Sequence, residues 1–152
     1  MNKLFSYCVM VVAIATWICL SVAAPWALGD TQNSFLKNFV NHEMLSFLGV
    51  VVTITLASAA SLHLELNKLE EQAKARIFFN TRHRIHQSAY ALILGLIAGV
   101  ALVTAKPLMG TTDTATSFVN GAALLIILFN VLVLTDLTKA TFALTPTIPD
   151  DE

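Results

Sequence analysis

Charge is scarce in this sequence. Of its 152 residues, only 12% are Asp, Glu, Lys or Arg, whereas 56% are hydrophobic. That charged fraction is about half of the roughly 25% found in soluble domains, and it leaves too little polar surface to cover a globule in water. The net charge of −1 produces no field that would attract nucleic acid. We therefore expect neither a soluble domain nor a nucleic-acid partner.

The sequence also lacks the motifs of common enzymes. It has no Gly-rich phosphate loop, no nucleophile elbow, no HExxH and no CxxC. Its two cysteines, Cys8 and Cys19, would lie about 16 Å apart along one helix, too far for a disulfide within the chain. We predict no enzymatic activity and no small-molecule substrate. We assign no catalytic, cofactor-binding or metal-binding residue, and we interpret both cysteines as packing residues.

Long apolar runs are what the sequence has in their place. Each is close to the roughly 20 residues that a helix needs to cross a membrane, and none has an acid or a base in its middle. We predict an all-α fold, an integral membrane four-helix bundle, with residues 1–152 as one transmembrane domain. The predicted spans are about 4–28, 44–66, 88–106 and 117–136.

The distribution of basic residues predicts the orientation. Five of the nine lie in the hairpin at 67–87, which we expect to be cytoplasmic. With both termini on the same side, only Lys37 and Lys106 fall outside, as the positive-inside rule for short loops requires. The expected location is the bacterial inner membrane, as a multi-pass protein with cytoplasmic termini.

The first apolar run has a second interpretation. Lys3, the apolar residues and the small residues before Ala24 resemble a secretory signal with a cleavage site. The run nevertheless continues to Leu28 and exceeds the roughly 7–15 residues of a signal core. We expect it to be retained as a span.

Two segments outside the spans carry helical patterns. The loop at 29–43 repeats apolar residues at one-turn spacing, which predicts a short helix on the membrane surface. After the second span, an apolar stripe predicts that the helix continues into the cytoplasm. Its partner would be the same segment of another subunit, another protein, or the rest of its own hairpin, which we favour. The stripe comprises Leu62, Leu66, Leu69, Ala73 and Ile77.

The histidines suggest one specific chemistry. In a hairpin that turns near residues 74 and 75, His63 and His86 are equidistant from the tip and lie at similar depth. Two imidazoles on adjacent helices are suited to bind a haem or a metal ion, with His83 as a third nitrogen ligand. We favour the simpler interpretation, in which these side chains hydrogen-bond lipid headgroups or Glu65 and the protein has no cofactor.

Small residues on two spans predict helix contacts, because they let helix backbones approach closely in lipid. One face contains Ala91, Gly95 and Gly99; the other contains Gly49, Thr53, Ala57 and Ser61. We interpret Asn130, in the middle of the fourth span, as a helix-packing residue, with a pore as the alternative.

The function predicted from these observations is association within the membrane. The partners would be the lipid bilayer and either further copies of the chain or another membrane protein. Two forms remain open, a small oligomeric pore that perturbs the membrane and an accessory subunit of a membrane complex. The alternative is a haem- or metal-binding electron-transfer protein that uses His63 and His86.

Overall fold

The structure, a computed structural model, describes residues 3–73, 79–110 and 112–142. These residues are almost entirely helical, and no β-strand occurs among them. The predicted all-α fold class is confirmed. The predicted turn at 74–75 and Ile77 of the apolar stripe lie outside the described residues.

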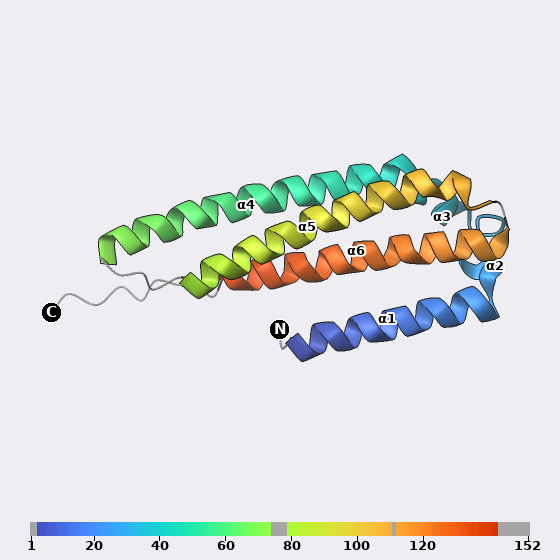
Figure 1. Ribbon diagram of the computed structural model, residues 1–152, viewed down its shortest axis with the longest axis horizontal. Coiled ribbons are helices and arrows are strands. Elements are labelled where there is room, and N and C mark those ends of the chain that lie inside the picture. The colour runs from blue at the N-terminus through green and yellow to red at the C-terminus, as the bar shows by residue number, and fades with distance from the viewer. Residues whose placement is uncertain (1–2, 74–78, 111, 143–152) are drawn as a thin grey trace.

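Four long helices account for most of the chain (Figure 1). They are α1 (Lys3–Ala23), α4 (Met44–Ala73), α5 (Phe79–Ala105) and α6 (Asp113–Phe142). Each contains a segment long and apolar enough to cross a membrane, which agrees with the predicted count of four. Large apolar side chains point outward from all four; Val11, Ile54, Leu94 and Val131 are exposed examples.

The helix in the first apolar run ends before the run does. Ala24 has φ −143° and ψ 64°, outside the helical region, and the single turn α2 (Pro25–Leu28) follows it. The physical reason is Pro25, because a proline ring clashes with the backbone of a preceding residue in α conformation. The chain changes direction there, at the right-hand end of Figure 1.

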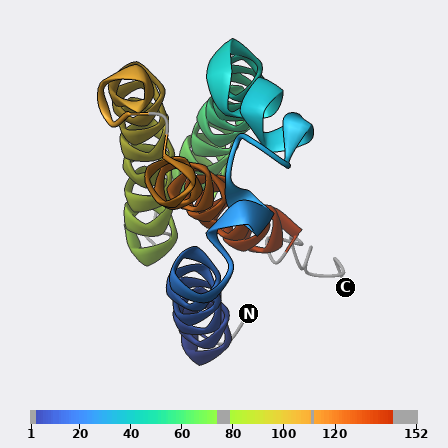
Figure 2. The same cartoon turned by 90° about the vertical axis from the view of Figure 1, so that its right-hand side faces the viewer.

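The four long helices do not enclose one common core. Helices α4, α5 and α6 pack together, while α1 lies along α6. Viewed end-on in Figure 2, α6 separates α1 from the pair formed by α4 and α5. The fold is therefore a three-helix unit with a fourth helix attached to one of its members, more open than a closed four-helix bundle.

Helix lengths differ on the two sides of α6. With 30 residues, α4 is about 45 Å long, whereas the 21 residues of α1 span about 32 Å. In Figure 1, α4 and α5 extend well beyond the amino end of α1. The predicted continuation of the second helix past its apolar run is thus present.

Two groups of buried side chains hold the three-helix unit together. The first lies where α3 (Ser34–Asn38) and α4 meet α6 and contains Leu36, Val40, Met44, Leu48, Val119 and Ala123. The second lies toward the hairpin and contains Ala59, Leu62, Leu66, Ile85 and Leu137. Leu62 and Leu66 belong to the predicted apolar stripe, so this part of the stripe packs within the chain, as we favoured.

A short segment connects α2 to α4. Helix α3 begins at an Asn33 cap, whose Oδ1 accepts a hydrogen bond of 3.0 Å from the backbone N–H of Leu36. The turn η1 (Phe39–Glu43) follows, and its backbone leaves the helical region at Val40 and Asn41. The predicted helix in this loop is therefore present but ends at Asn38. The segment lies across one end of the three-helix unit, which we call the loop end.

Candidate functional site

Gly95 and Gly99 of the small-residue face of α5 are buried. A Cβ atom built on Gly95 would lie 2.5 Å from Nδ2 of Asn130, and one built on Gly99 would lie 2.8 Å from Cδ1 of Leu48. A side chain at either position would force the facing Asn130 or Leu48 side chain to shift, so glycine lets α5 approach α6 and α4 this closely. The prediction that Gly95 and Gly99 mark a helix contact is confirmed, and the contact lies within the chain.

Asn130 takes part in the same contact. It is 1% exposed, and its Nδ2 donates to the backbone carbonyl of Ile126, one turn earlier, at 2.8 Å. Its Oδ1 is buried and has no hydrogen-bond partner among the described residues. The amide thus bonds to its own helix while it packs against Gly95, an arrangement that agrees with the helix-packing interpretation.

A third small-residue contact, which the sequence analysis missed, attaches α1 to α6. The indole of Trp17 lies so close to Gly121 that any side chain at that position would overlap it. The same indole meets the ring of Phe118 edge to face, with centroids 5.7 Å apart. One turn away, the buried hydroxyls of Ser21 and Ser117 lie 3.1 Å apart. The four-residue spacing of Ser117 and Gly121 is the signal that would have identified this contact.

The small-residue face of α4 has the opposite environment. Thr53, Ala57 and Ser61 are exposed, and a Cβ atom on Gly49 would meet nothing within 4 Å. The Thr53 hydroxyl donates to the carbonyl of Gly49 at 2.7 Å, so this polar group is satisfied by its own helix. We call Gly49, Thr53, Ala57 and Ser61 the α4 outer face. This face is partly exposed at Gly49 and exposed at its other three positions.

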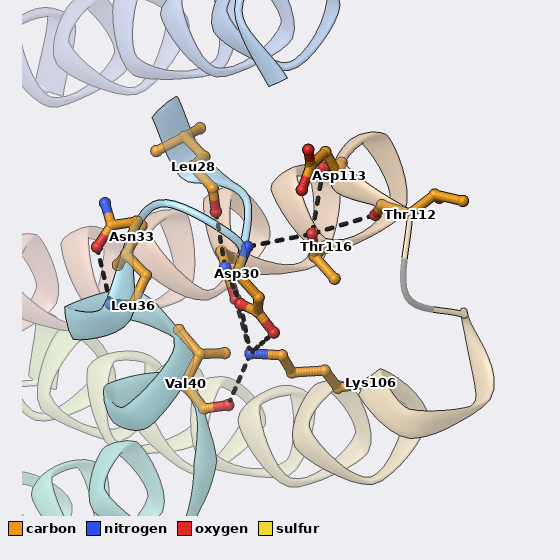
Figure 3. A network of polar contacts seen from close by, with 10 residues as sticks. Leu28, Asp30, Asn33, Leu36, Val40, Lys106, Thr112, Asp113 and Thr116 are labelled. Carbon is orange, nitrogen blue, oxygen red and sulfur yellow. Dashed lines mark hydrogen bonds and ion pairs between the residues drawn. The ribbon is translucent and has the colours of Figure 1, made fainter. Parts of the chain in front are cut away.

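A polar network closes the loop end (Figure 3). Lys106 donates to Asp30 Oδ1 at 3.2 Å, to Asn120 Oδ1 at 3.0 Å and to the carbonyl of Val40 at 3.4 Å. Asn120 in turn donates to the carbonyl of Leu28 at 2.7 Å. The network connects the short helix η2 (Lys106–Leu108), which directly follows α5, to the connecting segment and to α6.

This network fixes the relative positions of the elements at the loop end. The Lys106 and Asp30 side chains retain only 15% and 21% of their exposure, and the charges of this ion pair cancel. Partly buried, hydrogen-bonded ion pairs fix the relative position of the elements that carry them. In the sequence, Lys106 is recognisable only as a topology signal, and no pattern assigns a role to Asp30.

The hairpin brings the two predicted histidines together. The rings of His63 and His86 meet edge to face, with centroids 5.5 Å apart and planes at 84°. Nδ1 of His63 is buried without a partner among the described residues. Nearby, Arg82 donates to Glu70 at 2.8 Å and also to Asn67, which pairs α5 with α4. The prediction that the two rings lie at the same level is confirmed.

The geometry of the rings restricts what they can bind. Rings in edge-to-face contact leave no space between them for a porphyrin, so haem ligation would require the helices to separate. His83 is exposed and lies beside Gln87, with 3.1 Å between their side-chain nitrogens. Within the described residues, no group of three or more His, Cys, Asp and Glu is placed to hold a metal ion. Glu65, the other suggested partner, is exposed and makes no hydrogen bond to either ring.

Fold and contacts together define a class. The described residues form an all-α protein with four helices long and apolar enough to cross a membrane, three of them packed together and one attached through a Trp–Gly contact. No family model, curated protein or solved structure matches this chain.

Proposed function

We propose that the protein is a multi-pass inner-membrane protein without catalytic activity that associates with another membrane protein through the α4 outer face. The observation that carries the proposal is the exposure of this face. Gly95 and Gly99 of α5 and Gly121 of α6 are covered by side chains of other helices of the chain. On the α4 outer face, in contrast, a Cβ atom on Gly49 would meet nothing within 4 Å, and the other three residues are exposed. In lipid, helix association depends on close backbone packing, and small residues permit it.

The state of the polar groups favours an accessory subunit over a pore. Asn120 is engaged in the loop-end network, and Asn130 packs against Gly95. A pore would direct such side chains toward a water-filled path. The Thr53 hydroxyl, in the middle of the α4 outer face, bonds to its own backbone, so it can enter a protein contact as a satisfied donor.

The proposed orientation rests on the basic residues. The hairpin side carries most of them, as expected for the cytoplasmic side of a bacterial inner membrane. A reporter that is active only in the periplasm should be active when it is fused after Ser34. A reporter that is active only in the cytoplasm should be active when it is fused after Phe142. The reverse pattern would contradict this topology.

Paired substitutions on α4 test the association. Gly49→Leu with Ala57→Leu should abolish co-purification of the partner from mild detergent, because the added side chains hold the partner helix away. A Cβ atom on Gly49 would meet nothing within 4 Å, and Ala57 is exposed, so the fold should persist. Ala101→Leu, on the exposed side of α5, is the matched control and should retain the partner.

Two outcomes would decide against this function. An unchanged partner in the double variant would exclude the α4 outer face. Loss of membrane potential and growth arrest on overexpression, without any partner, would favour the oligomeric pore.

The contact between His63 and His86 keeps the electron-transfer alternative open to a simple test. If the protein is an electron carrier of this kind, the purified protein should be coloured or should contain stoichiometric metal. A reduced-minus-oxidised spectrum without a Soret band would exclude the haem version.

A further inference from the structure

A cavity of about 350 Å³ opens between α1, α5 and α6. It exists because α1 packs on α6 and leaves the neighbouring side of α5 uncovered. The volume lies within the range of roughly 300–1,000 Å³ that is usual for ligand sites. Its lining comprises Ser6, Tyr7, Met10, Gln87, Ser88, Ala91, Phe129, Leu132, Val133 and Asp136.

The lining is polar at one end and apolar at the other. On α1, Tyr7 precedes Met10 toward the interior; on α5, Ser88 precedes Ala91. Helix α6 runs in the opposite direction, and there Asp136 follows the apolar residues. All three helices therefore present polar groups at the hairpin side and apolar groups about one turn or more deeper.

Asp136 is the only charged residue among the described residues that line the cavity. It is partly buried, and its carboxylate makes no ion pair or hydrogen bond with another described residue. A carboxylate beside Leu132 and Val133 is stabilised by a cation that approaches from within the cavity. The hydroxyls of Ser6 and Ser88 are also without described partners and can donate to an anionic oxygen.

The depth of the cavity indicates its ligand. Its polar rim coincides with the hairpin-side ends of the predicted spans 4–28, 88–106 and 117–136, where headgroups begin. A molecule that places an ammonium and a phosphate at this level, with hydrocarbon beneath, matches the lining from rim to base. Anionic lipids without an amine would bring negative charge to Asp136.

We propose that this cavity binds a phospholipid with a primary ammonium headgroup, phosphatidylethanolamine in chemical class. Its ammonium pairs with Asp136, its phosphate accepts hydrogen bonds from the rim hydroxyls, and the start of one acyl chain lies against Phe129 and Leu132. The inference rests on membrane insertion from the proposed function, but not on the α4 outer face or on its partner.

Lipid retention tests the site. Purified full-length protein is equilibrated in mixed micelles with equal amounts of phosphatidylethanolamine, phosphatidylcholine and phosphatidylglycerol, and the lipid that remains after gel filtration is quantified by mass spectrometry. Phosphatidylethanolamine should be enriched. Phosphatidylcholine should be retained less, because its quaternary ammonium cannot donate a hydrogen bond to the carboxylate.

Two variants and a control locate the effect. Asp136→Asn should lower the enrichment of phosphatidylethanolamine over phosphatidylglycerol about ten-fold, as expected for one charge-assisted hydrogen bond. Ala91→Leu should reduce retention by filling the cavity while the carboxylate remains. Glu65→Gln, which removes an exposed carboxylate outside the cavity, should behave as wild type.

Several results would overturn the assignment. Unchanged selectivity in Asp136→Asn, full retention in Ala91→Leu, or equal enrichment of phosphatidylglycerol would each do so. If the protein binds dodecylammonium but does not retain phosphatidylethanolamine, the ligand is a free amphipathic amine and the lipid is excluded. These outcomes are separate from failure of the proposed function, which would show as a partner that still co-purifies with the Gly49→Leu, Ala57→Leu variant.

Discussion

Helices α4 and α5 carry small residues at the same spacing, yet the structure uses the two faces differently. On α5, Gly95 and Gly99 are covered by side chains of α6 and α4. On α4, Gly49 and its neighbours at four-residue spacing are open. A small-residue pattern thus identifies a surface suited to close helix packing, but it does not say whether the partner belongs to the same chain.

The strongest test of this difference places a large side chain on the covered face. Gly95→Leu should destabilise the protein by about 3 kcal/mol, because it forces α5 away from α6. Unfolding in dodecyl sulfate mixed micelles, followed by tryptophan fluorescence, measures the effect. Asn130→Ala combined with Gly95→Ala is the control, since removal of the amide provides space for the new methyl group. A Gly95→Leu protein as stable as wild type would refute the packing described.

The contact between Trp17 and Gly121 should respond less, because it anchors only α1. Trp17→Ala should cost about 2 kcal/mol and loosen α1 from α6 while α4, α5 and α6 stay together. Cysteines at Ser21 and Ser117, in a background without Cys8 and Cys19, report on this contact. Their disulfide should form readily with Trp17 present and slowly in its absence. Equal rates would show that the indole does not hold α1.

The smallest effect on stability is expected at the open face. Gly49→Leu should change the free energy of unfolding by less than about 0.5 kcal/mol, as at other exposed sites. The same micelle unfolding assay applies. Together with Gly95→Leu, the Gly49→Leu variant compares the effect of the same substitution at a covered and at an uncovered glycine. Similar destabilisation at both positions would mean that the α4 outer face is packed within the chain.

Several predictions that depended on local pattern agree with the structure. Helix type follows from long apolar runs without interior charge, whereas the break at Ala24, within the predicted span 4–28, was not predicted although Pro25 accounts for it. The shared level of His63 and His86 followed from counting residues on both sides of a hairpin. Each of these depends on residues near in sequence or on the regular rise of a helix.

Contacts between residues far apart in the chain were not predicted from the sequence. Asp30 and Lys106 are 76 residues apart, and no local pattern indicates that they meet. The contact between Trp17 and Gly121 and the cavity at Asp136 depend on which face of α6 receives α1. One sequence offers several small or apolar faces of similar quality, so their pairing is an outcome of packing.

Composition and periodicity alone determined that the described residues form four helices long and apolar enough to cross a membrane, because helical rise and the cost of unpaired backbone groups depend on each segment separately. Only the tertiary structure decided which small residues are covered, where the ion pair of Lys106 lies, and that α1 leaves a cavity beside α5. Those properties arise from the mutual fit of side chains on different helices, which no single segment contains.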